Sequence, residues 1–228
     1  MSQREPTRQT PSDEEQELKY ALASKADWER VCATLPGLEH ELRQRNSYWD
    51  TPTRALRALG ASLRLRIEES AALSRAFVTL KSGKRRSNGC FIADEIEAPI
   101  EMRDALAIHD GSLRFAALTN RVLVAVTALA IDCEQLQSWG ELENLRRCYR
   151  VSPTLTVEVD HSVLCDPRVA PDRRHAEFWE VELECVDVTS ARALLTRFLA
   201  AARADYKPQT MTKAERLAQF LAAGAGPS

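Results

Sequence analysis

The chain has 228 residues, of which 44% are hydrophobic, and its 31 Lys and Arg residues nearly balance its 33 Asp and Glu residues. This length predicts one domain with a sizeable core. The net charge of −2 argues against general binding to nucleic acid or to an anionic membrane. The polar N-terminus lacks the apolar core of a signal peptide, and the longest apolar run, residues 122–131, is too short to span a bilayer. We therefore expect a cytoplasmic protein.

The chain ends and the cysteines set the domain limits. Residues 1–13 are rich in Pro, Ser, Thr and charge, which predicts a disordered tail, followed by a single domain over residues 14–223. The six cysteines lack the paired spacing of a zinc site. We expect them to be reduced thiols.

Alternating apolar and charged residues predict strands through most of the first hundred residues. These strands lie near residues 15–22, 39–49, 61–69, 74–82 and 89–98. Ser24, followed by Asp27, begins a helix, and Pro52 begins a short helix that Gly60 ends. Turn residues follow the fourth strand, in the segments Ser82-Gly83-Lys84 and Ser87-Asn88-Gly89.

The second half of the chain begins with a helical region and then returns to strands. Helical spacing prevails between about residues 102 and 137. Strands are predicted near 142–151, 155–164 and 176–185, and helices over 189–203 and 211–223. The sum is an α+β fold in which about eight antiparallel strands form a sheet that can close on itself, with helices at its periphery.

Strand after strand carries charged or polar residues at positions i and i+2, which project from one face of a sheet. These sets are Glu15, Glu17 and Lys19; Arg64 and Arg66; Thr79 and Lys81; Glu95 and Glu97; Glu158 and Asp160; and Glu180, Glu182 and Glu184. Each set taken alone is typical of a solvated face. Taken together, they allow a second interpretation, in which the charged face rolls inward around a lumen.

An inward charged face is stable only if the lumen holds charged ligands, because buried unpaired charge is destabilising. A barrel of about eight strands has room for one small ligand. Basic side chains suit phosphate oxygens, and paired carboxylates suit Mg²⁺ or Mn²⁺. The face therefore predicts a metal–phosphate site.

Short motifs follow one another along the chain in a recognisable order. They are Glu15-Gln16-Glu17-Leu18-Lys19, Tyr48-Trp49-Asp50-Thr51, Leu63-Arg64-Leu65-Arg66, Thr79-Leu80-Lys81, Glu95-Ile96-Glu97, Val157-Glu158-Val159-Asp160, Glu180-Val181-Glu182 and Thr212-Lys213. In this order, from about residue 14 to 216, they resemble the signature of the CYTH, or triphosphate tunnel metalloenzyme, family. The resemblance implies an eight-stranded antiparallel β-barrel, a triphosphate substrate and Mg²⁺ or Mn²⁺ as the cofactor.

The resemblance also implies roles for individual residues. Phosphate oxygens would be bound by Lys19, Arg64, Arg66, Lys81, Arg146 and Lys213. Metal would be held among Glu15, Glu17, Glu158, Asp160, Glu180 and Glu182. We expect Lys81, Arg66 and Glu97 to act in catalysis, although Glu95 and Glu97 could instead hold the basic residues in place. Tyr48 and Asp50 fit a structural turn as well as a catalytic role.

The chain departs from the family pattern on the sixth strand. A Lys-x-Arg pair is common there, and this chain has Asn144 in the lysine position, followed by Arg146. Arg147 or Arg150 could compensate, although Arg147 belongs to the opposite face. Because that lysine would help to bind the far phosphate of the substrate, its absence bears on how this phosphate is bound.

Inorganic triphosphatase (tripolyphosphatase) is the activity that we expect, because nothing in the sequence indicates a base-recognition pocket. Thiamine triphosphatase is an alternative, but enzymes of that kind tend to carry a Trp before the LRxR motif, where this chain has Ala61 and Ser62. Class IV adenylate cyclase and a non-catalytic polyphosphate- or nucleotide-binding module also remain open. We expect a monomer or homodimer that binds neither nucleic acid nor membrane.

Overall fold

The computed structural model describes residues 14–87, 89–166 and 175–224. Its strands are β1 (Glu14–Leu22), β2 (Leu38–Asp50), β3 (Ser62–Glu69), β4 (Ser74–Ser87), β5 (Cys90–Ile100), β6 (Gln137–Ser152), β7 (Leu155–Cys165), β8 (His175–Glu184) and β9 (Tyr206–Pro208). Its α-helices are α1 (Lys25–Thr34), α2 (Ala55–Ala58), α3 (Met102–His109), α4 (Arg121–Ala128), α5 (Val188–Ala201) and α6 (Lys213–Gly224). Two short 3₁₀ helices, η1 (Phe115–Ala117) and η2 (Cys133–Gln135), flank α4.

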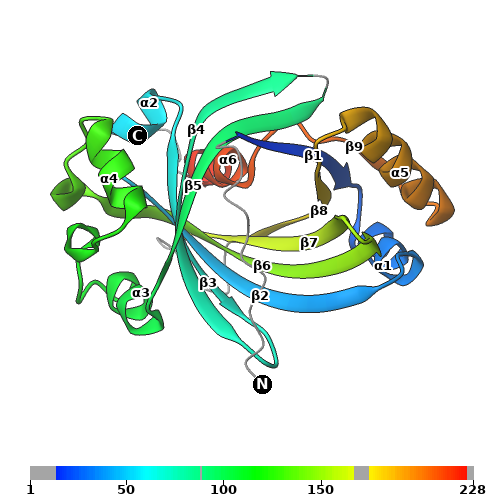
Figure 1. The fold of residues 1–228 in the computed structure, drawn as a ribbon, viewed down its shortest axis with the longest axis horizontal. Helices are drawn as coiled ribbons and strands as arrows, with labels where there is room; N and C mark the ends of the chain where they lie inside the picture. Colours follow the sequence, from blue (N-terminus) through cyan, green and yellow to red (C-terminus); the bar gives the residue numbers. More distant parts are fainter. Residues whose placement is uncertain (1–13, 88, 167–174, 225–228) are drawn as a thin grey trace.

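Eight of the strands form a closed antiparallel barrel, as the sequence predicted (Figure 1). The strand order is β5-β4-β3-β2-β6-β7-β8-β1, and β1 closes the ring by pairing with β5. The second half of the same β1 edge pairs with the short β9. Because the ring is closed, one face of every strand points into a common interior.

The apolar face of the barrel points outward and is covered by helices on two sides (Figure 1). On one side, α1 and α5 pack on β1, β7 and β8 through residues such as Val31, Leu195 and Leu183. On the other side, α3 and α4 pack on β3, β4 and β5 through residues such as Ile108 and Val126. This cover removes the outward apolar face from water, so the charged residues of the alternating strands are left inside.

Helix α6 packs against a third apolar cluster that belongs to the barrel interior. Leu217 of α6 is fully buried and contacts a group that contains Tyr48, Leu142 and Phe178. Gly140 of β6 permits this approach, because a Cβ there would lie 2.9 Å from Leu217 Cδ2. The interior is therefore partly apolar beside α6 and charged elsewhere.

Most predicted elements are confirmed to within a few residues, and one predicted turn is wrong. Ser82, Gly83 and Lys84 do not end the fourth strand, because β4 continues to Ser87 through an irregularity between Ser82 and Arg85. Gly83 has φ 58° there, a conformation that glycine adopts at β-bulges. The predicted disordered tail lies outside the described residues. Among the described helices, none is long and apolar enough to cross a membrane.

Candidate functional site

The charged sets that the sequence singled out lie on the inner face of the barrel, except that Glu184 is exposed at the end of β8. Cross-strand pairs point to one side of a sheet, and the register places Lys19 opposite Glu182, Glu158 opposite Glu182, and Asp160 opposite Glu180. The outward neighbours Leu18, Val159 and Val181 belong to the core beneath α1 and α5. Alternation along each strand thus separates the charges from the core.

The strands β1, β7 and β8 together form an acidic wall. Carboxylate oxygens of Glu17, Glu158 and Glu182 lie within 4.8 Å of one another, and so do those of Asp160, Glu180 and Glu182. Asp160, Glu180 and Glu182 are at most 2% exposed. The structure therefore brings together five of the six predicted metal ligands. Their donors are all carboxylate oxygens, which fit a hard divalent cation such as Mg²⁺ or Mn²⁺.

The carboxyl groups of the acidic wall have pKa values that are shifted in opposite directions. Burial raises the pKa of Glu158 above its usual range, and the nearby Asp160 and Glu182 add to this effect against the influence of Arg146. Burial would also raise the pKa of Glu182, but Lys19, Lys213 and Arg146 hold it well below the usual range. Glu158 is therefore the less neutralised carboxylate and the one with more to gain from a bound cation.

Two cations of the barrel are bound tightly to this wall. Lys19 Nζ lies 2.8 Å from Glu17 Oε2 and 2.8 Å from Glu182 Oε1. Arg146 donates to Asp160 at 2.6 and 2.9 Å and to Glu182 at 2.7 Å, and it also forms an ion pair with Glu158. Burial would lower the pKa of the Arg146 guanidinium, but these carboxylates raise it.

Lys213 reaches the same wall from α6. Thr212 and Glu215 form a capping box, with Thr212 N donating to Glu215 Oε2 at 2.7 Å and Glu215 N donating to Thr212 Oγ1 at 3.2 Å. This cap fixes the helix start and delivers Lys213 Nζ to Asp160 Oδ2 at 2.8 Å, to Glu182 Oε1 at 2.6 Å and to Glu180. Lys213 thus lies inside the barrel and balances three carboxylates.

The opposite side of the interior is a basic wall on β3. Arg64 Nη2 lies 3.2 Å from Thr79 Oγ1 and 3.9 Å from Glu97, and Arg66 Nη1 lies 3.3 Å from Glu68. Burial lowers the pKa of the Arg66 guanidinium, and the charges of Arg64 and Arg146 lower it further. Burial would also lower the pKa of the Arg64 guanidinium, but Tyr48, Glu95 and Glu97 raise it. Arg66 is therefore the less neutralised cation of this wall, which favours an anion beside it.

Lys81 of β4 lies between two carboxylates of the neighbouring strands. It forms ion pairs with Glu15 and, at 2.8 Å, with Glu95. Burial raises the pKa of Glu15 to about 8, against the opposing effect of Lys81. Burial would raise the pKa of Glu95 as well, but Lys81 and Arg64 hold it at about 2. Glu15 thus belongs to this group and to neither carboxylate cluster of the acidic wall.

The sequence left two roles possible for Glu97 and for Asp50, one catalytic and one structural, and their contacts favour the structural one. Glu97 accepts a hydrogen bond from Thr79 Oγ1 at 3.0 Å, and Thr79 contacts Arg64, so Glu97 supports the basic wall. Asp50 accepts from the backbone N–H groups of Thr51, Leu56 and Arg57 at 2.8–3.1 Å. These bonds hold the chain at the start of α2, so the contacts of Asp50 are structural.

Asn144 is buried inside the barrel and takes part in a neutral network. Its Nδ2 donates to Gln44 Oε1 at 2.8 Å, and its Oδ1 accepts from Ser162 Oγ at 2.8 Å. Neither suggested replacement for the missing lysine lies near it, because Arg147 pairs with Glu41 and Arg150 pairs with Glu39. The lysine position is therefore filled by a neutral amide, and neither Arg147 nor Arg150 takes its place.

Sequence reasoning missed several inner residues. Glu68 accepts from Gln44 Nε2 at 2.7 Å and from Arg75 at 2.8 Å, and Gln209 donates to Glu180 at 3.0 Å. The signal for Glu68 was present, since it extends the alternation of Arg64 and Arg66 by one step. Gln209 follows β9, and no periodic pattern in the sequence predicts that it faces the interior.

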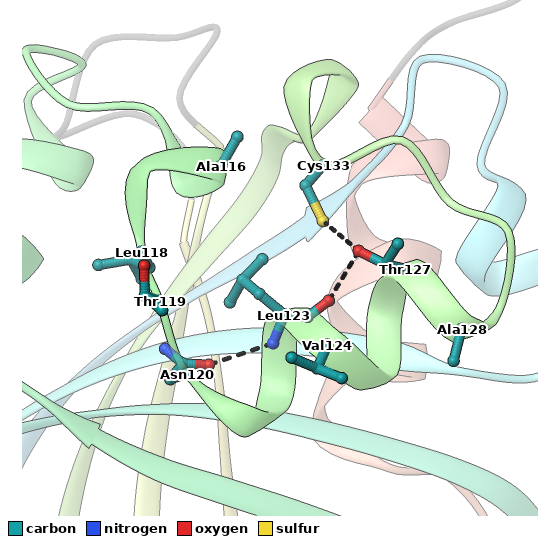
Figure 2. Close-up of a pocket in the computed structure, with 9 residues that line it drawn as sticks. All are labelled: Ala116, Leu118, Thr119, Asn120, Leu123, Val124, Thr127, Ala128 and Cys133. Carbon is teal, nitrogen blue, oxygen red and sulfur yellow. Dashed lines mark hydrogen bonds between the residues drawn. The ribbon is translucent and has the colours of Figure 1, made fainter.

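A separate hollow lies outside the barrel, between α4, η1 and η2 (Figure 2). It has a volume of about 520 Å³ and no charged side chain in its lining. Asn120 Oδ1 accepts from the N–H groups of Val122 and Leu123 there and caps α4. Nothing in this hollow suits a phosphate or a metal ion, so the candidate site is the barrel interior.

Known proteins resemble the chain in sequence pattern and in fold. A family model described as the CYTH domain matches residues 13–217. A solved structure from Hippeastrum, of a putative adenylyl cyclase (HpAC1) described as having a dominant triphosphatase activity, has a TM-score of 0.78 at 21% identity and covers 90% of this chain and 95% of its own.

Two further structures show the same fold. A putative adenylate cyclase from Bacillus halodurans has a TM-score of 0.62 at 20% identity, over 90% of this chain and 98% of its own. The PH1819 protein from Pyrococcus horikoshii has a TM-score of 0.57 at 17% identity, over 89% and 98% of the two chains. No curated protein matches the sequence.

Proposed function

This chain belongs to the CYTH domain family, and we propose that it is a divalent-metal-dependent triphosphatase whose substrate is inorganic tripolyphosphate. The observation that carries the proposal is the pairing of two walls inside one closed barrel. An acidic wall around Glu182 faces the interior together with a basic wall around Arg66, whose charge is incompletely neutralised. A metal–polyphosphate complex combines a cation, which the acidic wall would bind, with an anion, which the basic wall would bind.

Glu17, Glu158 and Glu182 are the residues that would hold a divalent ion, because their oxygens already converge within 4.8 Å. When bound, such an ion supplies charge neutralisation for phosphate oxygens and acidifies coordinated water. On the opposite wall, Arg64 and Arg66 offer guanidinium groups to the phosphate chain. Lys81 lies beyond them as a further cation.

The reaction would be the hydrolysis of tripolyphosphate to one phosphate and one pyrophosphate. Water adds to a terminal phosphorus, and the bond from that phosphorus to its bridging oxygen breaks. Such a reaction depends on positioning and on stabilising the charge of the leaving group rather than on a covalent nucleophile. In this interior, Arg64, Arg66 and Lys81 are the groups placed to stabilise that charge, while Glu97 and Glu95 hold them in place.

Tripolyphosphate is the proposed substrate because the described interior offers charged side chains and neutral amides, which suit phosphate oxygens. The small apolar cluster in the interior already packs against Leu217 of α6. Position 62, at the start of β3, is a serine whose hydroxyl accepts from Lys84 Nζ at 2.9 Å, so it offers no aromatic surface for an organic ring. The triphosphatase activity described for the Hippeastrum relative supports hydrolysis over cyclisation.

One assay panel tests the proposal. Tripolyphosphate, thiamine triphosphate and ATP are each incubated with Mg²⁺ or Mn²⁺, and phosphate, pyrophosphate and cyclic AMP are measured. We expect metal-dependent phosphate release from tripolyphosphate at the highest kcat/KM. Preference for thiamine triphosphate, or formation of cyclic AMP, would overturn the proposed substrate, and no turnover of any compound would indicate a binding module.

A matched pair of variants connects this activity to the acidic wall. Glu158→Gln removes a charge from the converging carboxylates, and we expect it to lower kcat by two orders of magnitude or more. Glu177→Gln makes the same change on β8, where the side chain is half exposed and pairs with His161. It should leave turnover unchanged, and equal rates in the two variants would remove Glu158 from the site.

A further inference from the structure

We infer that Asn46 is a further substrate-binding residue, whose amide N–H donates a hydrogen bond to an oxygen of the phosphate chain beside Arg66. This inference rests on the proposed function, since it names a contact within the same site. Asn46 lies on β2, directly opposite Arg66 of β3 in the strand register, and only 1% of its surface is exposed.

The orientation of the Asn46 amide follows from its contact with Arg66. Arg66 Nε donates to Asn46 Oδ1 at 2.8 Å. A guanidinium group has no acceptor, so the amide oxygen must face it, and Nδ2 must lie on the other side of the planar amide. Within the described part of the chain, Asn46 Nδ2 is buried and has no hydrogen-bond partner.

The neighbouring neutral side chains show that this free donor is unusual. Gln44 donates to Glu68 and accepts from Asn144, and Asn144 accepts from Ser162, all at 2.7–2.8 Å. These amides have partners on both their oxygen and their nitrogen. A buried donor without a partner destabilises a protein by about 1–3 kcal/mol. Asn46 is therefore the amide of this network that a ligand oxygen would satisfy.

The charges around Asn46 favour an anionic oxygen. Arg66 Nε is used by Asn46 and Nη1 by Glu68, whereas Nη2 makes no hydrogen bond or ion pair with the described residues. Burial lowers the pKa of the Arg66 guanidinium, and the positive charges of Arg64 and Arg146 lower it further, against the effect of Glu68. Asn46 Nδ2 and Arg66 Nη2 thus provide two unused donors on adjacent strands, and phosphate oxygens accept from such pairs of donors.

A purely structural role for Asn46 predicts a different outcome from substitution. If Asn46 only positions Arg66, Asn46→Asp preserves the role, because a carboxylate accepts from Nε at least as well as an amide does. If Asn46 donates to phosphate, Asn46→Asp removes the donor and adds a negative charge beside the anion. Asn46→Leu removes donor and acceptor without adding charge. The added carboxylate repels a bound phosphate chain under either role, so N46D tests whether position 46 lies beside the phosphate. N46L in an Arg66→Gln background separates donation to phosphate from positioning of Arg66.

The test is calorimetric titration of tripolyphosphate into the full chain with EDTA present, with hydrolysis measured separately. We expect N46D to weaken binding roughly ten- to hundredfold, the range for losing a hydrogen bond to a charged group, and N46L to weaken it less. Asn120→Asp is the matched control, since Asn120 Nδ2 is also buried without a partner among the described residues, but outside the barrel (Figure 2). N120D should bind as the wild type does.

Binding by N46D within twofold of the wild type would overturn the inference. N46L is also measured in the wild type and in an Arg66→Gln background, which serves as well if N46D does not fold, because direct contact persists without Arg66 and positioning does not. A vanishing effect in that background would refute direct contact. If the wild type binds tripolyphosphate but hydrolyses none, the proposed function fails, and the binding series still decides the role of Asn46.

Discussion

Lys213 should contribute strongly to the stability of the barrel in the absence of metal. The Lys213 residue is only 8% exposed, although it lies at the start of α6, where the helix dipole disfavours a cation. It lies 2.8 Å from Asp160 and 2.6 Å from Glu182, and it also pairs with Glu180. Lys213→Met keeps much of the side-chain volume and leaves these three carboxylates without that cation.

The magnitude follows from the burial of those carboxylates, each of which is at most 2% exposed. Removing one partner from a buried ion pair typically destabilises a protein by about 3–5 kcal/mol. For a chain of this length each kcal/mol lowers Tm by about 2–4 °C. We therefore expect K213M to unfold about 6–20 °C below the wild type in EDTA.

Thermal unfolding followed by circular dichroism checks this expectation, with Lys207→Met as the control, because Lys207 is an exposed lysine of β9. Added Mg²⁺ should raise the Tm of K213M more than that of the wild type, since the vacated carboxylates gain a second cation to bind. A K213M protein as stable in EDTA as K207M would refute the reasoning, because the three carboxylates would then not need the ammonium group.

Three further substitutions separate the roles of inner residues. Arg66→Lys replaces the planar fork with a point charge and should lower kcat/KM for tripolyphosphate about a hundredfold in steady-state assays, whereas Arg147→Lys, on the outer face, should not. Asp50→Ala removes the bonds that hold the start of α2 and should lower the free energy of unfolding in urea by about 0.5–2 kcal/mol, with kcat unchanged; a collapse of kcat in a folded D50A protein would restore a catalytic role. Leu217→Ala opens a cavity beneath α6 and should destabilise the protein by about 2–5 kcal/mol, and protease protection of α6 should fall with it.

The inner face of the barrel could be predicted from sequence because strand periodicity is rigid. Arg64 and Arg66 alternate with Leu63 and Leu65, and the apolar pair can be buried only on the side that the helices cover. Once that side is fixed, the charged pair must point the other way. The same reasoning placed the alternating charges of the strands on one face without any knowledge of their partners. Arg146 and Lys213 were assigned only from the family resemblance, because Lys213 lies on a helix and has no strand periodicity.

The partners themselves could not be predicted, because they depend on register and on docking between distant segments. Lys213 meets Asp160 only after α6 packs against the barrel interior through Leu217. The alternation of charged residues does not reveal Asn46 and Gln44, because both residues are neutral. The turn assigned at Gly83 was wrong for a related reason, since a glycine with positive φ serves a bulge as well as a turn.

The cations of the interior fall into two groups that have different consequences for binding. Lys19, Arg146 and Lys213 each lie within 2.9 Å of two or more carboxylates of the acidic wall. Lys81 is paired in the same way with two carboxylates of the neighbouring strands, Glu15 and, at 2.8 Å, Glu95. Arg64 and Arg66 are 3.9 and 3.3 Å from their nearest carboxylates. The first group neutralises the carboxylates of the protein itself. In the second group, the pKa of Arg66 is lowered by burial and by Arg64 and Arg146, so Arg66 is the cation that an anionic ligand would stabilise most.

This division gives Asn144 a physical explanation. A lysine at that position would stand beside Gln44 and Ser162. Glu68, which accepts from Gln44, already pairs with Arg66 and Arg75, so it is not a free counter-charge for that lysine. An amide avoids that unpaired charge and keeps the wall polar. Under the proposed function, the charge for the far end of a phosphate chain would then come from Arg66, and a neutral donor next to Arg66 would gain in importance for the same reason.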